Sequence, residues 1–243
     1  MAKKSSAAPP APPKKGAAAA LSDYALPVPT GALLAETSIA YHPASDRRLV
    51  LVVASDQAAL DSLLLRASIY YEHPTHRAKF LDELSFAGAQ AAQKKRFVYY
   101  GHNMPLSSLA SFLTAAANAR SPLTPGESHL ARALASPKLK AFPNGARQIA
   151  PVVADAYLVG LVRGDVATLQ HEMQHAWFHF DAAGYRSACT DALASLDTMM
   201  RLQVRAYLQG CGYCEAVWVD EFQAHLCCGD AMPQVELTRG LKG

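Results

Sequence analysis

Residues 165–180, DVATLQHEMQHAWFHF, are the most informative stretch of this 243-residue chain. Asp165 is a good N-cap, so the pattern predicts a helix over Val166–Phe180. At 100° per residue the apolar side chains fall on one stripe of this helix, which comprises Val166, Leu169, Met173, Ala176, Trp177 and Phe180. The three histidines fall on nearly the opposite side. We therefore expect one face to pack on a core and the other to present imidazoles.

The segment contains the HExxH motif, His171-Glu172-Met173-Gln174-His175. Residues at i and i+4 lie one turn apart on one face of a helix, so His171 and His175 can bind one Zn²⁺ ion together. Glu172 is then placed beside a metal-bound water, which it can deprotonate. The spacing favours a metal-binding helix over a surface helix with three unrelated histidines.

On this motif and a candidate ligand downstream, residues 166–225 resemble the HExxH zinc metallopeptidases, the zincins. The resemblance implies an α+β, helix-rich, zincin-like domain with a small sheet and a central HExxH helix. It also implies that His171 and His175 bind Zn²⁺, that Glu172 is the general base, and that the substrate is a peptide or protein.

The third metal ligand lies outside the motif, and several residues compete for it. The metzincin pattern HExxHxxGxxH fails, because Phe178 and Asp181 stand where it requires Gly and His. Gluzincins take a Glu from a later helix, and Glu221 fits that pattern. His179 competes, but histidines at i, i+4 and i+8 span about 12 Å along a helix, which is too far for one ion. We prefer Glu221, and Asp181 is a weaker alternative.

Four further side chains are expected near the site without binding the metal. Asp220 and His225 could orient a ligand imidazole or hydrogen-bond the substrate. His179 is expected in the wall of the cleft or behind a ligand. Tyr185 could stabilise an oxyanion, although an ordinary half-buried tyrosine is the more common case.

Upstream of the motif the pattern predicts a few strands among helices. Strands are predicted at Arg47–Ser55 and Lys95–Tyr100, while Ala156–Val162 fits a strand or the start of a buried helix. Helices are predicted at residues 56–71, 77–84, 106–119 and 127–135, and one long helix over Ser187–Leu208 ends at the glycine Gly210. His102 and Asn103 follow the second strand, where loops often line sites, although they also fit a plain turn.

The five cysteines are an odd number, and no secretory signal is recognisable, which indicates a reducing compartment. Cys211 and Cys214 form a CxxC motif, and Cys227 and Cys228 follow it. Together with His225 they could form a structural zinc site. We prefer a helix-ending loop followed by buried thiols, because adjacent cysteines rarely both bind one ion comfortably.

Residues 1–22 form a basic Ala/Pro/Lys tail with four lysines and no acid, and this composition predicts disorder. Residues 23–243 are expected to form a single domain. Without the tail's four lysines the chain has 19 basic residues against 20 acidic ones, so a nucleic-acid-binding body is not supported. No apolar run is long enough to span a membrane. We expect a cytoplasmic or other reducing intracellular protein.

These patterns predict a hydrolase, a zinc-dependent metalloprotease. The alternative is a non-catalytic zinc-bearing interaction or regulatory protein, against which the intact Glu172 speaks. A nucleic-acid binder acting through its lysine-containing tail is a weaker alternative. Cleavage specificity and oligomeric state are not predicted by the sequence.

Overall fold

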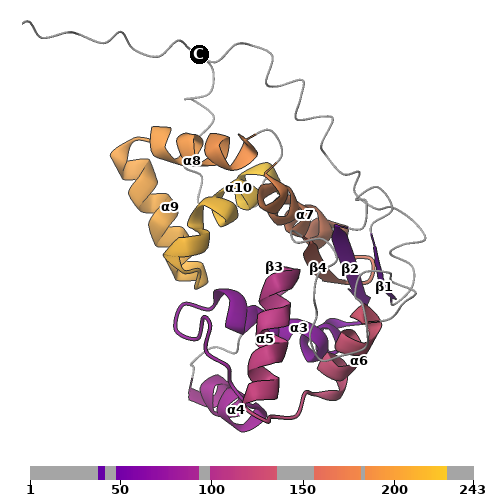
Figure 1. The fold of residues 1–243 in the computed structure, drawn as a ribbon. Helices are drawn as coiled ribbons and strands as arrows, with labels where there is room; N and C mark the ends of the chain where they lie inside the picture. Colours follow the sequence, from indigo (N-terminus) through magenta and orange to yellow (C-terminus); the bar gives the residue numbers. More distant parts are fainter. Residues whose placement is uncertain (1–37, 42–47, 93–98, 136–155, 182–183, 229–243) are drawn as a thin grey trace, which may run out of the picture.

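The computed structural model describes residues 38–41, 48–92, 99–135, 156–181 and 184–228 (Figure 1). The predicted tail at residues 1–22 and most of the predicted strand Lys95–Tyr100 lie outside the described residues. Within them the chain is helix-rich with a small mixed sheet, which confirms the α+β class. None of the described helices is long and apolar enough to cross a membrane.

The sheet contains four strands in the order β1-β2-β4-β3. These are β1 Ser38–Tyr41, β2 Leu49–Ala54, β3 His102–Pro105 and β4 Tyr157–Val162. The central strands β2 and β4 are parallel, with Val52 opposite Gly160. The outer strands β1 and β3 run antiparallel to their neighbours. The stretch Ala156–Val162 is therefore a strand rather than the start of a helix.

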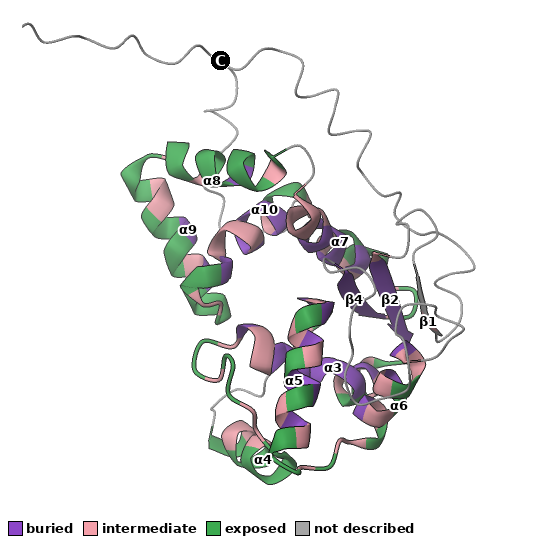
Figure 2. Ribbon diagram, viewed as in Figure 1, coloured by how far each residue is buried: buried purple, intermediate pink, exposed green. Residues whose placement is uncertain are grey.

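Helices cover both faces of this sheet, so its central strands are apolar throughout instead of alternating. On β2 the residues Leu49, Leu51 and Val53 pack with the side chains of α7 (Val166–Phe180). The intervening residues of β2 pack against α3 (Gln57–Glu72), α5 (Leu106–Asn118) and α6 (Pro125–Leu134). The buried residues accordingly run through the middle of the molecule, between the two helical layers (Figure 2).

Four predicted helices are confirmed, and short polar caps explain where three of them begin. The side chains of Asp56, Thr124 and Asp165 accept hydrogen bonds from backbone N–H groups in the first turns of α3, α6 and α7. Thr124 and Glu127 form a complete capping box. The fourth helix, α5, follows β3 directly.

Two predicted helices are wrong. Residues 77–82 form a turn and an irregular stretch in which Ala78 has a φ of 56°, and α4 (Glu83–Ala92) begins only after Asp82 caps it. The long helix predicted over Ser187–Leu208 is divided into α8 (Tyr185–Ser195) and α9 (Thr198–Cys211). The division occurs because Asp197 accepts a hydrogen bond from the N–H of Met200 and begins a new helix.

The end of α9 also differs from the prediction. Gly212, with a φ of 96°, is the left-handed C-cap, whereas the predicted Gly210 lies inside the helix. A 3-10 turn at Glu215–Val217 then leads into α10 (Trp218–Cys228).

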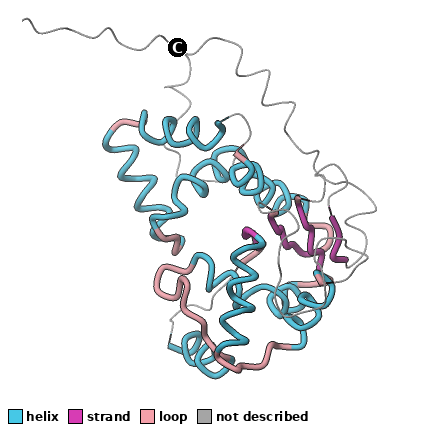
Figure 3. The backbone as a smooth tube through the Cα atoms, viewed as in Figure 1, coloured by secondary structure: helices cyan, strands magenta, loops and turns pink. Residues whose placement is uncertain are grey.

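Helix α10 runs beside α7 on the side that faces away from the sheet (Figures 1 and 3). Phe222 is 1% exposed and packs with Val204 and Leu208 of α9, which fixes the rotation of α10 about its axis. Leu226, one turn further along α10, is 40% exposed. The opposite side of α10 is turned toward α7.

Candidate metal centre

Helix α7 has the two faces that its sequence predicts. Leu169, Met173 and Ala176 are fully buried against the sheet. His175 is buried and His171 is partly buried on the other side. Val166, in the first turn, is 45% exposed, so it is not part of the buried apolar face.

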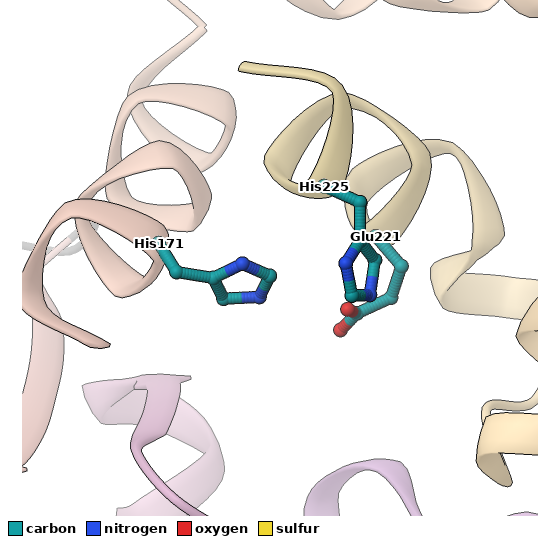
Figure 4. A group of neighbouring side chains, drawn as sticks. All are labelled: His171, Glu221 and His225. Atoms are coloured by element: carbon teal, nitrogen blue, oxygen red, sulfur yellow. The ribbon is translucent and has the colours of Figure 1, made fainter. Parts of the chain in front are cut away.

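Two pairs of side chains spaced i, i+4 face one another across the α7–α10 interface. His171 projects from α7 toward Glu221 and His225 on α10 (Figure 4). One donor atom from each of these three residues lies within 4.8 Å of the other two. The Nε2 atom of His175 is 3.3 Å from the Nε2 atom of His171 and 3.8 Å from Oε1 of Glu221. Three potential metal donors therefore lie close together, and His175 lies beside two of them, His171 and Glu221.

The spacing of these donors can be tested against the geometry of zinc. Two nitrogens that each lie about 2.0–2.1 Å from a tetrahedral ion are about 3.3–3.4 Å apart. The 3.3 Å between the Nε2 atoms of His171 and His175 has this value, and Glu221 is slightly farther away. Imidazole nitrogens and carboxylate oxygens are also among the ligands that bind Zn²⁺ in proteins.

Asp220 orients His175 from behind. Its Oδ1 lies 2.9 Å from Nδ1 of His175. A proton held on Nδ1 by this carboxylate leaves the lone pair on Nε2, which points toward His171 and Glu221. Asp220 thus lies beside His175, which is compatible with one of the two roles that the sequence analysis offered for it.

Glu172 is buried beside these donors and is held by a chain of hydrogen bonds. The Nδ2 of Asn103 donates to Oε2 of Glu172 at 2.7 Å, and the hydroxyl of Tyr157 donates to Oδ1 of Asn103 at 2.5 Å. Asn103 was one of two residues singled out after the predicted strand. Tyr157 was missed, because it lies in an apolar strand with no local sign of a polar role.

The backbone at Gly101 approaches Glu172 so closely that no side chain fits between them. A Cβ atom at this position would lie 2.3 Å from Oε1 and 2.7 Å from Cγ of Glu172, and 2.6 Å from Cγ2 of Thr168. The lack of a side chain at position 101 therefore allows the carboxylate of Glu172 to lie where it does.

We expect Gly101→Ala to lower the rate of any reaction that uses Glu172 by about 10- to 100-fold, because displacing a reacting group by about 1 Å costs this much. Metal content is expected to stay unchanged. The matched control is Gly88→Ala in α4, where an added Cβ meets nothing within 4 Å. Equal activity of the two variants would show that Gly101 does not position Glu172.

The buried groups of the site perturb one another's protonation. Burial raises the pKa of Glu172, although His175 and the hydrogen bond from Asn103 oppose this. Burial likewise raises the pKa of Glu221 to about 8, against the influence of His175. For His175 burial acts to lower the pKa, but the carboxylates of Asp220 and Glu221 outweigh it and the pKa is raised well above its ordinary value.

Without metal, the free energy of unfolding is expected to fall as the pH rises from about 5 to about 8. In this range Glu221 is protonated in the folded chain but ionised in the unfolded chain. The free energy of unfolding therefore falls as the pH rises toward the pKa of folded Glu221, about 8. The raised pKa of His175 also makes the free energy of unfolding fall as the pH rises, once the pH exceeds the pKa of this histidine in the unfolded chain. A loss on the order of 3 kcal/mol is expected. Thermal unfolding of the chelated chain measures it, and a melting temperature that rises over this range would contradict it.

These residues line a cleft of about 880 Å³, a volume typical of small-ligand and peptide sites. His171, Glu172, His175, Glu221 and His225 form one part of its lining. Tyr99, Tyr213 and Glu72 are among the other residues that line it. The cleft thus combines the candidate metal donors with aromatic and acidic walls.

Asp220 and three other predicted site residues are not among those that line this cleft. The ring of His179 packs on Tyr157, with centroids 4.7 Å apart, and His179 is not among the residues that line the cleft. The reason is helical geometry, because position 179 lies two turns beyond position 171. Asp181 caps the end of α7 and accepts a hydrogen bond from the N–H of Arg186. Tyr185 donates to Oε1 of Gln223.

The cysteines do not gather into a metal site within the described part of the chain. All five are free thiols. Among the described residues, the one group of three potential metal donors is that of His171, Glu221 and His225, which contains no cysteine. Cys211 ends α9, which agrees with the predicted helix-ending loop. The predicted burial of the next thiols is wrong, because Cys227 at the end of α10 is exposed and Cys228 is only partly buried.

The geometry thus defines a candidate mononuclear metal centre on two packed helices, with a buried carboxylate beside it. No protein-family model, curated protein or solved structure matches this chain. The function has to be argued from the site itself.

Proposed function

We propose that this chain is a zinc-dependent metallopeptidase with a zincin-like domain. The observation that carries the proposal is the 3.3 Å spacing of the Nε2 atoms of His171 and His175, with Glu221 facing them and Glu172 buried alongside. In this proposal His171, His175 and Glu221 would hold the metal. His225 reaches the same point and is the candidate for a fourth ligand or a contact to substrate.

Bound zinc would polarise the substrate carbonyl and lower the pKa of a bound water toward about 7. Glu172 accepts the proton of the attacking water and passes it to the leaving amine. Asn103 binds Oε2 of Glu172, so the orientation of the carboxylate is set before substrate arrives. Asp220 keeps His175 in the tautomer that offers Nε2.

In this proposal an extended peptide would lie along strand β3 of the sheet. Strand β3 is at one end of the strand order, and its Asn103 is hydrogen-bonded to Glu172. A peptide that adds to the outer edge of β3 would run past the site, with backbone hydrogen bonds supplying affinity. This arrangement supports a peptide bond as the scissile bond.

The test is zinc-dependent cleavage of a peptide library by the purified full chain, read by mass spectrometry. We expect cleavage to be lost on treatment with 1,10-phenanthroline and to return when Zn²⁺ is added. A folded chain that holds one zinc and cleaves no peptide would contradict the proposal and favour the zinc-bearing interaction protein.

A further inference from the structure

Glu72, the last residue of α3, is an acidic side chain of the cleft that the proposed chemistry does not use. It is 6% exposed and lines the same cleft as Glu172 and Glu221. Within the described residues its carboxyl group makes no hydrogen bond and no ion pair. Glu72 is not one of the three residues whose donor atoms lie within 4.8 Å of one another.

The surroundings of Glu72 disfavour a negative charge on it. Burial first, and then the carboxylates of Glu221 and Glu172, raise its pKa well above the ordinary value, while His175 opposes them. The C-terminal end of a helix is also the negative end of its dipole, where an acidic residue is unfavourable. His73, the next residue, does not provide a compensating cation, because burial and then His76 lower its pKa.

A bound metal ion would not remove the excess of negative charge around Glu72. A divalent ion offsets two negative charges, whereas the carboxylates of Glu221, Glu172 and Asp220 can already supply three, so a charge on Glu72 is still uncompensated. The walls around it suit a cation, because Tyr99 and Tyr213 line the same cleft and aromatic rings attract positive charge. Both tyrosines are close enough for Glu72 to influence their pKa.

We propose that Glu72 is the specificity residue of the cleft and binds a positively charged nitrogen of the substrate, next to the bond that is cleaved. This inference rests on the proposed peptidase function and names its substrate class, peptides with a cationic group at this position. The group is either the free amino terminus or a basic side chain, which present the same chemistry to a buried carboxylate.

Four peptide pools distinguish these sources. They have a free or an acetylated amino terminus, combined with lysine or glutamine at a central position. Cleavage of each pool by zinc-loaded wild type is compared with that of Glu72→Gln and of the control Glu83→Gln, which removes an exposed carboxylate in the first turn of α4.

We expect wild type and Glu83→Gln to cleave either the pools with a free amino terminus or the pools with lysine at least about tenfold faster than the neutral pool. Glu72→Gln is expected to lose this preference while keeping its zinc and its rate on the neutral pool, because only the charge-assisted contact is removed. The melting temperature of Glu72→Gln is expected to be unchanged or higher. An undiminished preference in this variant, or a clear loss of stability, would overturn the inference.

Binding of the same pools to a zinc-loaded Glu172→Gln chain separates this inference from the proposed function, because it needs no turnover. Cationic pools are expected to bind at least about tenfold more tightly than the neutral pool, and a second change, Glu72→Gln, removes the difference. If no pool is cleaved but this pattern holds, the peptidase proposal fails and the cation site stands. If the pools bind equally or none binds, the cation site is overturned.

Discussion

Glu221→Ala is expected to lower the zinc content of the purified chain from about one ion to near zero. The substitution removes the only carboxylate of the proposed ligand set. His225 lies near the same donors but is not one of the three proposed ligands, so we do not expect it to replace Glu221 at full affinity. His175→Ala is expected to have the same effect. Zinc per chain, measured by mass spectrometry after dialysis without chelator, checks both.

Asp220→Asn tests the same site and is expected to have a smaller effect than these two variants. It leaves the ligands in place but weakens the hold on Nδ1 of His175, so zinc affinity is expected to fall by about 10- to 100-fold. Asp191→Asn, which changes an exposed residue of α8, is the matched control. His225→Ala shows whether that histidine is a fourth ligand. Zinc that is retained at full affinity in Glu221→Ala would refute the assigned site.

Glu172→Gln is expected to lower peptide hydrolysis by about 10²- to 10⁴-fold and to leave zinc content unchanged. Glutamine has nearly the shape of glutamate and can still accept the hydrogen bond from Asn103, but it cannot take a proton from water. The rate constant on a cleaved library peptide, with zinc measured in the same sample, checks this.

Glu215→Gln, which changes an exposed carboxylate before α10, should keep full activity and serves as the control. A Glu172→Gln variant that also keeps full activity would exclude Glu172 as the base. A variant that loses its zinc would instead place this residue among the groups that hold the metal.

The parts of the site that are predictable from sequence are those whose signals are local. The cap at Asp165, the apolar stripe and the i, i+4 spacing of His171 and His175 all lie within one helix, and α7 has the predicted bounds. The division between α8 and α9 was missed although its signal is also local, because the capping Asp197 lies within an otherwise helical pattern.

The remaining residues of the site come from other elements and carry no local signal. Gly101 and Asn103 reach Glu172 from the start of β3, Tyr157 comes from β4, and Glu72 ends α3. Tyr157 reads as one more apolar residue of a buried strand. In the sequence Glu72 resembles any polar residue at the end of a helix, because its burial depends on other elements of the fold that pack over it.

The sequence by itself determined a helix with a core face and an imidazole face, because helical periodicity needs only neighbouring residues. Only the tertiary structure decided which acidic group meets that face. Glu221 lies 46 residues beyond His175, and it reaches the imidazoles because Phe222 packs on α9 and turns the opposite side of α10 toward α7. The sequence made Glu221 the preferred candidate over His179 and Asp181, but only side-chain packing between distant helices brings it to the imidazoles.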